Sequence, residues 1–475
     1  MNEHELPGGG TPAGEISAPI LCPFCGAGLT QADRFCTVCG RALPGDGGEA
    51  LLLPKKAPFS ASWREILAAL ATYVLAWWYL FDAGLLFRPL DGDALSWGWV
   101  LAFVLGFVGL TELLFRRTRR SWESWVWLGC LAVLTVGLLW GGHGAWETWQ
   151  ISLFLHLDAV YWVLCRSGRL AEGESGHLVL LDGLHGFVIL PFKHFFLRLR
   201  TVAYALGQPF RNRRRLPLEA LLWSLFALMV AIGLFAIALS LLTKADAGFD
   251  KLVGRVAGWF LFDWQISDFL LKLLFSLPVG QYLYGLIAGS AREDPQVLRD
   301  RGRRLCAWVA DLRRVPNKVW TVLTAAFCLL YLAFFAVQSR YLFGAFTRTL
   351  PEGFIVSQYA REGFFELCRV MALNFALLWL VTRLSRSPVR ENRAALLLCL
   401  ILLVESMLFA VVAFSKLLLY IDCFGFTPLR LQSSWLVCVL FAGCLAAGRT
   451  LLTGKKSFRA WLIFSCVTLS LLCLV

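Results

Sequence analysis

Four cysteines near the start of the sequence have the spacing of a metal-binding site. Cys22 and Cys25 form one C-x-x-C pair. Cys36 and Cys39 form a second pair, and a glycine follows the second cysteine of each pair. Two such turns supply four thiolates, the ligand set that tetrahedral zinc takes, and the glycines let backbone amides approach the sulfur atoms. The spacing therefore predicts a structural zinc site, which folds its own peptide and leaves no coordination position open for catalysis.

A redox-active C-x-x-C pair is the alternative, but two glycine-followed pairs within residues 22–39 argue against it. Over residues 21–42 the stretch resembles the short zinc ribbons found at the N-termini of many bacterial membrane and regulatory proteins. Because a closed site does no chemistry, we expect a structural or docking unit for a cytoplasmic protein partner. Nucleic acid is not the expected partner, since the ribbon offers only Arg34 and Arg41 as cations for phosphate.

A second set of residues that could do chemistry lies in apolar segments far along the chain. The charged and amide residues of two neighbouring segments are Glu362, Glu366, Arg369, Asn374, Glu405 and Lys416. The first three are spaced by four and three residues, so they share one helix face. Glu405 and Lys416 are eleven residues apart, which is about three helical turns and again one face. Because a charge inside a bilayer is costly, each of these residues is a candidate site residue.

The expected depths of these residues in the membrane allow two arrangements. At ~1.5 Å per residue, Glu366 and Lys416 each lie within about one turn of the outer surface, where they could form an ion pair. Glu405 lies nearest in depth to Asn374. Two interpretations stay open: the residues form pairs that fix helix packing, or they bind a ligand or an ion.

Two short motifs flank this set, YAREGFFEL at residues 359–367 and YIDCFGFTPLR at residues 420–430. Together they resemble a large group of uncharacterised bacterial polytopic membrane proteins, the domains of unknown function four-one-five-three and four-one-seven-three. The likeness covers about residues 200–470, and its matching residues are Tyr359, Ala360, Arg361, Gly363, Phe364, Phe365, Glu366, Leu367, Tyr420, Gly425, Thr427 and Arg430. The resemblance implies a membrane fold without an assigned activity, and it favours one outer site made by both motifs. The predicted polar membrane site then consists of Tyr359, Arg361, Glu362, Glu366, Arg369, Asn374, Glu405, Lys416, Tyr420, Thr427 and Arg430.

The elements that must position these residues are membrane helices. Of 475 residues, 58% are hydrophobic and 16% are charged, whereas soluble domains are about a quarter charged. Apolar runs of about 20 residues, the length that spans a bilayer as a helix, recur along the chain. The composition predicts an all-α polytopic membrane protein and excludes a large soluble core. We expect about eleven transmembrane helices, at residues 64–83, 94–115, 122–141, 145–165, 218–242, 259–289, 319–339, 363–382, 394–420, 434–452 and 459–475.

The positively charged residues indicate the orientation of these helices. Of the 45 Lys and Arg residues, 34 fall in the N-terminus and in alternate loops, and 8 fall in the remaining loops. Since Lys and Arg collect in cytoplasmic loops, we expect the N-terminus and the ribbon in the cytoplasm and the C-terminus outside, in a bacterial inner membrane. The formal net charge of +13 has the same explanation, so it gives no reason to expect a nucleic acid.

The expected domains are a disordered leader at residues 1–20, the zinc ribbon at 21–42, a flexible Gly- and Pro-rich linker at 43–62 and the membrane domain at 63–475. The leader lacks the basic start and the apolar core of a signal peptide.

Two long loops on the expected cytoplasmic side have structure-forming patterns. Residues 166–217 are apolar but broken by glycine and proline, which predicts a re-entrant segment or an interfacial amphipathic helix. Residues 291–318 predict a basic helix. Each loop could lie on anionic lipid, meet a partner or present a solvated face.

The sequence contains no catalytic motif that assigns a reaction. It has no H-E-x-x-H and no nucleophile elbow, and LLTGKKS at residues 451–457 lacks the first glycine of a phosphate loop. We therefore expect a non-enzymatic membrane sensor or scaffold, whose ribbon docks a partner and whose outer polar site binds a ligand or fixes packing. The alternatives are a secondary transporter or channel that uses the intramembrane charges, and an enzyme that acts on lipid.

Overall fold

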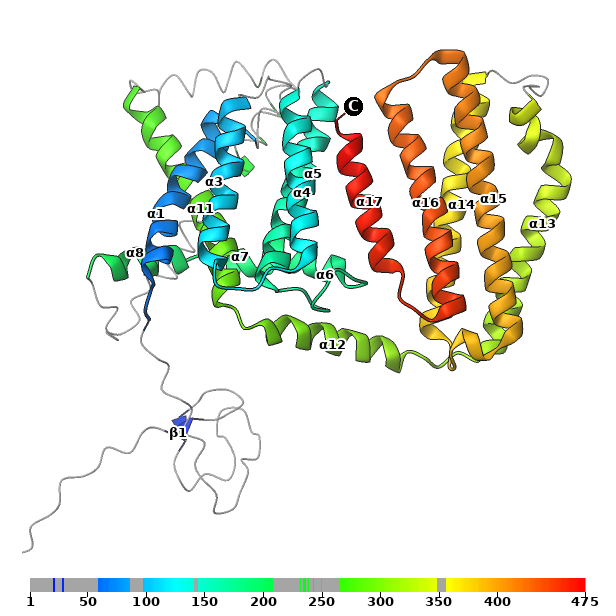
Figure 1. Ribbon diagram of the computed structural model, residues 1–475, viewed down its shortest axis with the longest axis horizontal. Coiled ribbons are helices and arrows are strands. Elements are labelled where there is room, and N and C mark those ends of the chain that lie inside the picture. The colour runs from blue at the N-terminus through cyan, green and yellow to red at the C-terminus, as the bar shows by residue number, and fades with distance from the viewer. Residues whose placement is uncertain are drawn as a thin grey trace, which may run out of the picture. The chain divides into compact units, whose positions relative to one another are not determined.

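The structure is a computed structural model, shown in Figure 1. It describes residues 59–85, 97–140, 144–207, 265–347 and 356–474, together with 20–21, 28–29 and single positions between 231 and 249. The chain divides into two compact units, Met1–Ser60 and Ala61–Val475.

In the N-terminal unit, two short paired strands flank the first cysteine pair. Strand β1 (Ile20–Leu21) pairs antiparallel with strand β2 (Gly28–Leu29), so that Leu21 lies opposite Gly28. The pairing brings together the two ends of the stretch that contains the first C-x-x-C. All four cysteines lie outside the residues that the structure describes, so the zinc site stays a prediction.

Long helices of the second unit match ten of the eleven predicted spans. They are α1 (Trp63–Trp77) with its continuation η1 (Trp78–Asp82), α3 (Trp97–Phe115), α4 (Trp122–Trp140), α5 (Ala145–Ser167), α11 (Gln265–Arg292), α13 (Asn317–Thr347), α14 (Val356–Leu384), α15 (Arg393–Phe424), α16 (Pro428–Thr453) and α17 (Phe458–Leu472). Shorter elements connect them: α6 (Val179–Leu184), η2 (His185–Ile189), α7 (Leu190–Lys193), α8 (Leu197–Ala205), α12 (Pro295–Asp311) and η3 (Val389–Glu391). The predicted span at 218–242 lies outside the continuously described ranges.

Most of these helices can cross a membrane. Within the described residues, eight are long and apolar enough, or nine if the bent pair Val179–Lys193 and Leu197–Ala205 is one span. Two further helices, α5 and the 15-residue α17, also occupy predicted spans. The prediction of a helical, multi-pass membrane domain is confirmed for the described part of the chain, and the number of eleven spans stays a prediction.

Local polar signals fix where the helices begin. At α1, the Ser62 amide donates to Glu65 Oε2 at 2.8 Å and the Glu65 amide donates to Ser62 Oγ at 3.4 Å. At α15, Asn392 Oδ1 accepts from the Ala394 amide at 3.1 Å. Because the first amides of a helix have no partner within it, such side chains define its first turn.

The membrane unit has two apolar cores. The first joins α1, α3, α4, α5 and α11, and its fully buried members include Trp162 and Leu164. The second joins α13, α14, α15 and α16 and contains Phe409, whose ring lies 5.2 Å from that of Tyr331 and 4.6 Å from that of Phe335. Figure 1 shows α14, α15 and α16 side by side, and α17 contacts both α16 and α4.

Contacts between the helix ends divide them into two sets. Several pairs join ends that are predicted to be cytoplasmic: Glu65 with Arg292, Arg169 with Ser290, Asn317 with Ser387, Arg390 with Leu452, and Arg459 with Glu123. At the opposite ends, Gln432 donates to Gln150 at 3.1 Å, and both residues are predicted to lie near the outer surface. The contacts group the helix ends as the predicted topology does, and the assignment of one set to the cytoplasm stays a prediction.

The long loop after α5 contains the expected broken apolar segment, which we call the broken segment (α6, η2, α7 and α8). Its two parts meet at an angle of 43°. It packs closely on α5, since a Cβ on Gly186 would lie 2.8 Å from side-chain atoms of Val160 and Leu164. Its exposed apolar residues, spaced by four, are Leu180, Leu184 and Val188. This face suits contact with lipid.

The second long loop forms the expected basic helix, α12. Arg301, Arg303 and Arg304 are exposed on it, whereas Leu298 and Gly302 are buried. The helix is therefore amphipathic, with its arginines turned to solvent or to a charged surface.

Candidate functional site

The second core contains a chain of hydrogen bonds across three helices. The Tyr331 hydroxyl of α13 donates to Asn374 Oδ1 of α14 at 2.7 Å. Asn374 Nδ2 donates to Ser406 Oγ of α15 at 2.9 Å, and that hydroxyl donates to the Leu402 carbonyl at 2.8 Å. Asn374 is 3% exposed, so its amide acts as a polar link inside an apolar bundle.

Glu405 lies next to this chain and is buried without a hydrogen bond. It precedes Ser406 on α15, is 5% exposed and lies within electrostatic reach of Tyr331. The Cys328 thiol lies beside it but donates to the Leu398 carbonyl at 3.6 Å. Neither of its carboxylate oxygens has a hydrogen-bond partner among the described residues. We call Tyr331, Asn374, Glu405 and Ser406 the polar cluster. A buried carboxyl group without a partner is stabilised when it takes up a proton, a cation or a hydrogen-bond donor.

Lys416 lies on the same helix and is 1% exposed. It packs against Gly363 of the first motif, where an added Cβ would overlap the Lys416 ammonium and lie 3.2 Å from its Cδ. Glu366 is exposed on α14, and its carboxylate acts electrostatically on Lys416. The two charges therefore interact electrostatically, whereas the ion pair between them stays a prediction. The glycine explains how the lysine side chain fits.

The two contacts define the register of α14 against α15. Asn374 meets Ser406, and Gly363 meets Lys416, so the helices run antiparallel. Ten residues separate Ser406 from Lys416 along α15, which corresponds to roughly 15 Å. The predicted polar membrane site is thus resolved into two levels, the polar cluster and the Lys416 contact.

The second motif forms the corner between α15 and α16. Gly425 ends α15 with a φ of 79°, a conformation that favours glycine. Arg430 donates to the carbonyls of Phe424, at 2.8 Å, and Gly425, and its guanidinium lies 4.3 Å from the Tyr420 ring centroid. Thr427 is the residue before α16. These groups satisfy the free carbonyls at the end of α15, so the structure gives Tyr420 and Arg430 a role in the turn itself.

Of the remaining predicted site residues, Arg369 is described and is exposed on α14. The structure does not describe the side chains of Tyr359, Arg361 and Glu362 or the ribbon cysteines. Sequence reasoning missed Tyr331, Ser406 and Cys328, and it named Gly363 only as a residue of the first motif. Tyr331 and Ser406 had a signal, since each is a polar residue in an apolar run. Their partners on other helices had none.

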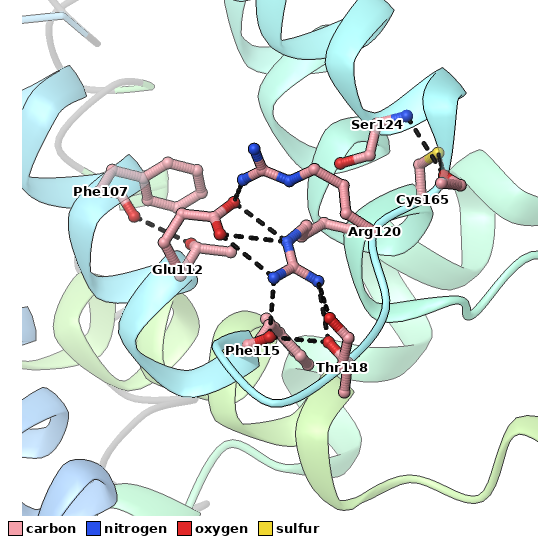
Figure 2. A network of polar contacts seen from close by, with 10 residues as sticks. Phe107, Glu112, Phe115, Thr118, Arg120, Ser124 and Cys165 are labelled. Carbon is pink, nitrogen blue, oxygen red and sulfur yellow. Dashed lines mark hydrogen bonds and ion pairs between the residues drawn. The ribbon is translucent and has the colours of Figure 1, made fainter.

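Charged clusters that the sequence did not single out join the helix ends near α12. Figure 2 shows the first one, in which Glu112 of α3 pairs with Arg120. Glu112 also accepts from Arg166 of α5, at 3.0 Å from Nε. Arg166 is 4% exposed and donates to Thr118 Oγ1 at 2.8 Å and to the Phe115 carbonyl at 2.7 Å. The guanidinium is fully used within the protein, which indicates a packing role.

A second cluster joins α17 to α4. Buried Glu123 accepts from the Ser175 amide at 3.0 Å and from its hydroxyl at 2.7 Å, and it pairs with Arg459. Arg459 also binds Glu174 at 2.5 Å. Glu123, Glu174 and Arg459 border a cavity of about 220 Å³. Because each charge has an opposite charge beside it, the cluster ties α17 to the rest of the unit.

A third cluster holds the broken segment to the end of α11. Glu293 is 5% exposed and accepts from His185 Nε2 at 3.1 Å and from Lys193 Nζ at 2.5 Å. Burial alone would raise the pKa of Glu293, but the hydrogen bonds and charges of His185 and Lys193 outweigh it and hold the pKa at about 2. The carboxylate is therefore ionised at neutral pH and fixes the broken segment in place.

The fold and the buried polar residues define a polytopic α-helical membrane protein of unassigned activity. The chain belongs to the family described as "Domain of unknown function (DUF4153)", whose model matches residues 126–475. The expected resemblance to domain of unknown function four-one-five-three is confirmed, and it begins earlier than residue 200. No curated protein and no solved structure matches the chain.

Proposed function

We propose that this protein is a non-enzymatic membrane sensor or scaffold. Its sensing element is the polar cluster in α13–α15, and its N-terminal zinc ribbon docks a cytoplasmic partner. The observation that carries the proposal is Glu405, a carboxyl group buried in a membrane helix with no hydrogen bond among the described residues. Intramembrane ionisable groups are costly, and they mark functional sites by default.

The chemistry of the polar cluster limits what it binds. Tyr331, Asn374 and Ser406 already satisfy one another, so the available acceptor is the Glu405 carboxyl group. A carboxylate only accepts hydrogen bonds, so its ligand is a proton or a small cation. Because Asn374 joins three helices, a change of charge beside it alters their packing, which is how the signal leaves the site.

The ribbon is the expected output. The antiparallel pairing of β1 and β2 on either side of the first C-x-x-C supports a zinc-bound turn at Cys22 and Cys25. With Cys36 and Cys39 it supplies four thiolates, and the metal would contribute folding energy alone. The excess of Lys and Arg in the loops grouped with α12 favours a cytoplasmic position for this end of the chain.

The sensing role is tested by thermal melting of purified protein in detergent between about pH 5 and 8, with and without added sodium or potassium. The wild type is expected to respond to pH or to the cation. Glu405→Gln should melt cooperatively but lose the response, whereas Glu391→Gln, at an exposed position of η3, should keep it. If Glu405→Gln keeps the full response, or loses the cooperative transition, the residue serves packing and the sensor proposal fails.

The docking role is tested by crosslinking in native membranes followed by purification of the chain. The intact chain should contain bound zinc and capture a cytoplasmic protein. Cys22→Ser/Cys25→Ser should lose both. The control Cys306→Ser/Cys438→Ser changes two exposed cysteines outside the ribbon and should lose neither. Identical capture by all three proteins would remove the docking role.

A secondary transporter is the second candidate, because one observation favours it. The broken segment is an interrupted helix that packs against α11, a continuous helix that contains Pro278, and interrupted helices form the substrate sites of many transporters. Flux of protons or sodium into proteoliposomes, abolished by Glu405→Gln, would favour transport over sensing.

A further inference from the structure

The first core contains a cavity that the polar cluster does not explain. It has a volume of about 300 Å³ and lies between α3, α5, α11 and the broken segment. Its lining includes Phe103, Phe107, Phe187, Val279, Leu283 and Leu286. An apolar cavity of ~150 Å³ already admits a benzene ring and stays free of water, and this one is larger.

The polar groups on the cavity wall are already satisfied. The Tyr79 hydroxyl and His156 Nε2 are 2.9 Å apart, and His156 Nδ1 lies 2.5 Å from the Ser152 carbonyl. A carbonyl accepts, so Nδ1 carries the proton and Nε2 accepts from Tyr79. The Tyr282 hydroxyl donates to the Phe187 carbonyl at 3.0 Å. The wall therefore offers no unused donor from these three side chains, and the space suits hydrocarbon better than water or a polar ligand.

The walls of the cavity are held apart by close backbone contacts. A Cβ on Gly285 of α11 would lie 2.7 Å from the Pro191 carbonyl oxygen, and one on Gly289 would lie 2.8 Å from the His194 ring. The ion pair of Glu293 with Lys193 fixes the same face. The broken segment thus rests on α11 at its glycines and cannot move inward to fill the space between its aromatic side chains and α5.

The cavity lies beside surface that suits the bilayer interior. Pro278 and Val279 line it and are partly exposed. Immediately before them, α11 exposes Leu274, Phe275 and Leu277. The broken segment carries its own exposed apolar row, described above. A lipid chain can therefore enter from the hydrocarbon region without crossing a polar surface.

We infer that this cavity is a binding site for one hydrocarbon chain of a membrane lipid, either acyl or polyprenyl. The chain lies against the aromatic side chains of α3 and the broken segment, with the Tyr79–His156 pair closing the inner wall. The headgroup stays outside the cavity, since the three polar lining side chains are paired within the protein. The site is separate from the polar cluster, so its test is independent of the proposed function.

The experiment uses the full chain in nanodiscs that contain phospholipid with a diazirine in the middle of one acyl chain. After illumination, adducts are mapped by peptide mass spectrometry. We expect adducts on lining residues such as Phe187, Val279 and Leu283. Ala159→Phe fills the cavity from α5, and it should reduce these adducts about tenfold, to the level of general bilayer contact.

The matched control is Ala132→Phe, which adds the same ring to an exposed position of α4 and should leave the adducts unchanged. If Ala159→Phe does not fold, Ala159→Leu fills less of the cavity and serves instead. Extraction of lipid from the purified protein identifies a retained acyl or polyprenyl chain, and either one supports the site. The inference is overturned if a folded cavity-filling variant labels like the wild type, or if adducts are as frequent on exposed Leu329 and Leu330 of α13 as on the lining.

Discussion

The close approach of α11 to the broken segment makes Gly285 a sensitive test of the first core. An alanine there would place its Cβ 2.7 Å from the Pro191 carbonyl oxygen and 3.3 Å from the Pro191 Cα. Both are backbone atoms, so the contact cannot be relieved by rotating a side chain. The broken segment must move away from α11, and the hydrogen bonds of Glu293 to His185 and Lys193 resist that movement.

The magnitude follows from a comparison with Gly129. A Cβ on Gly129, which is exposed on α4, would meet nothing within 4 Å. Both substitutions gain the same helix propensity, about 1 kcal/mol for glycine to alanine, so that gain cancels in their difference. What remains is the overpacking cost at Gly285, about 1–3 kcal/mol. Gly285→Ala should therefore be less stable than Gly129→Ala by that amount.

The assay is the free energy of unfolding in mixed micelles, measured by denaturant titration of the wild type and both variants. Gly129→Ala should equal or exceed the wild type, and Gly285→Ala should fall below Gly129→Ala. Equal stability of the two variants would refute the packing of the broken segment on α11. It would also remove the rigid wall on which the hydrocarbon cavity depends.

The other predictions concern single polar residues. Asn374→Ala removes a partner of both Tyr331 and Ser406 and should cost about 1–3 kcal/mol in the same titration. The control Ser433→Ala should cost less, because this half-buried hydroxyl donates to the Leu429 carbonyl of its own helix, α16. A loss at Asn374 no larger than that at Ser433 would contradict the chain of hydrogen bonds. Glu293 has a pKa lowered to about 2 from an ordinary 4.5, so its stabilising effect is present above pH 4.5 and is lost as the pH falls toward 2. Glu293→Gln should have a lower melting temperature than the wild type at neutral pH, and this difference should shrink on acidification. A difference that does not change with pH would show that the ionised carboxylate does not stabilise the protein. Arg430→Lys keeps the charge but loses the planar guanidinium on the Tyr420 ring, so it should lower the melting temperature, and an unchanged melting temperature would exclude a role for Arg430 in the corner.

The sequence allowed the helices to be predicted because each one carries its own signal. Apolar runs of spanning length, such as the run in α15, determine a membrane helix without reference to any other segment. Glu405 and Lys416 could be recognised for the same reason, since an ionisable residue in such a run is costly wherever it points. Asn374 and Glu405 were also placed at one depth correctly, because helical rise converts residue number into depth.

The partners of these residues could not be predicted in the same way. Tyr331 lies 43 residues from Asn374 and Ser406 lies 32 residues away, so nothing local connects them. In the second motif, the sequence predicted a binding site where the structure has a turn. Gly425 turns the chain so that Arg430 reaches the carbonyls at the end of α15. A local pattern of polar residues does not distinguish a binding site from a well-satisfied corner.

Hydropathy and helical rise are properties of single segments, so they are enough to predict a multi-pass helical membrane protein with costly charges at particular depths. The folded structure is needed to see that Asn374 links three helices, that Lys416 fits against Gly363 and that Glu405 lacks a hydrogen bond among the described residues. The tertiary structure also creates the hydrocarbon cavity, whose walls come from five separate stretches of chain, namely η1, α3, α5, the broken segment and α11. Hydrogen-bond partners and cavities depend on how helices far apart in the sequence pack against one another, and no single segment contains that information.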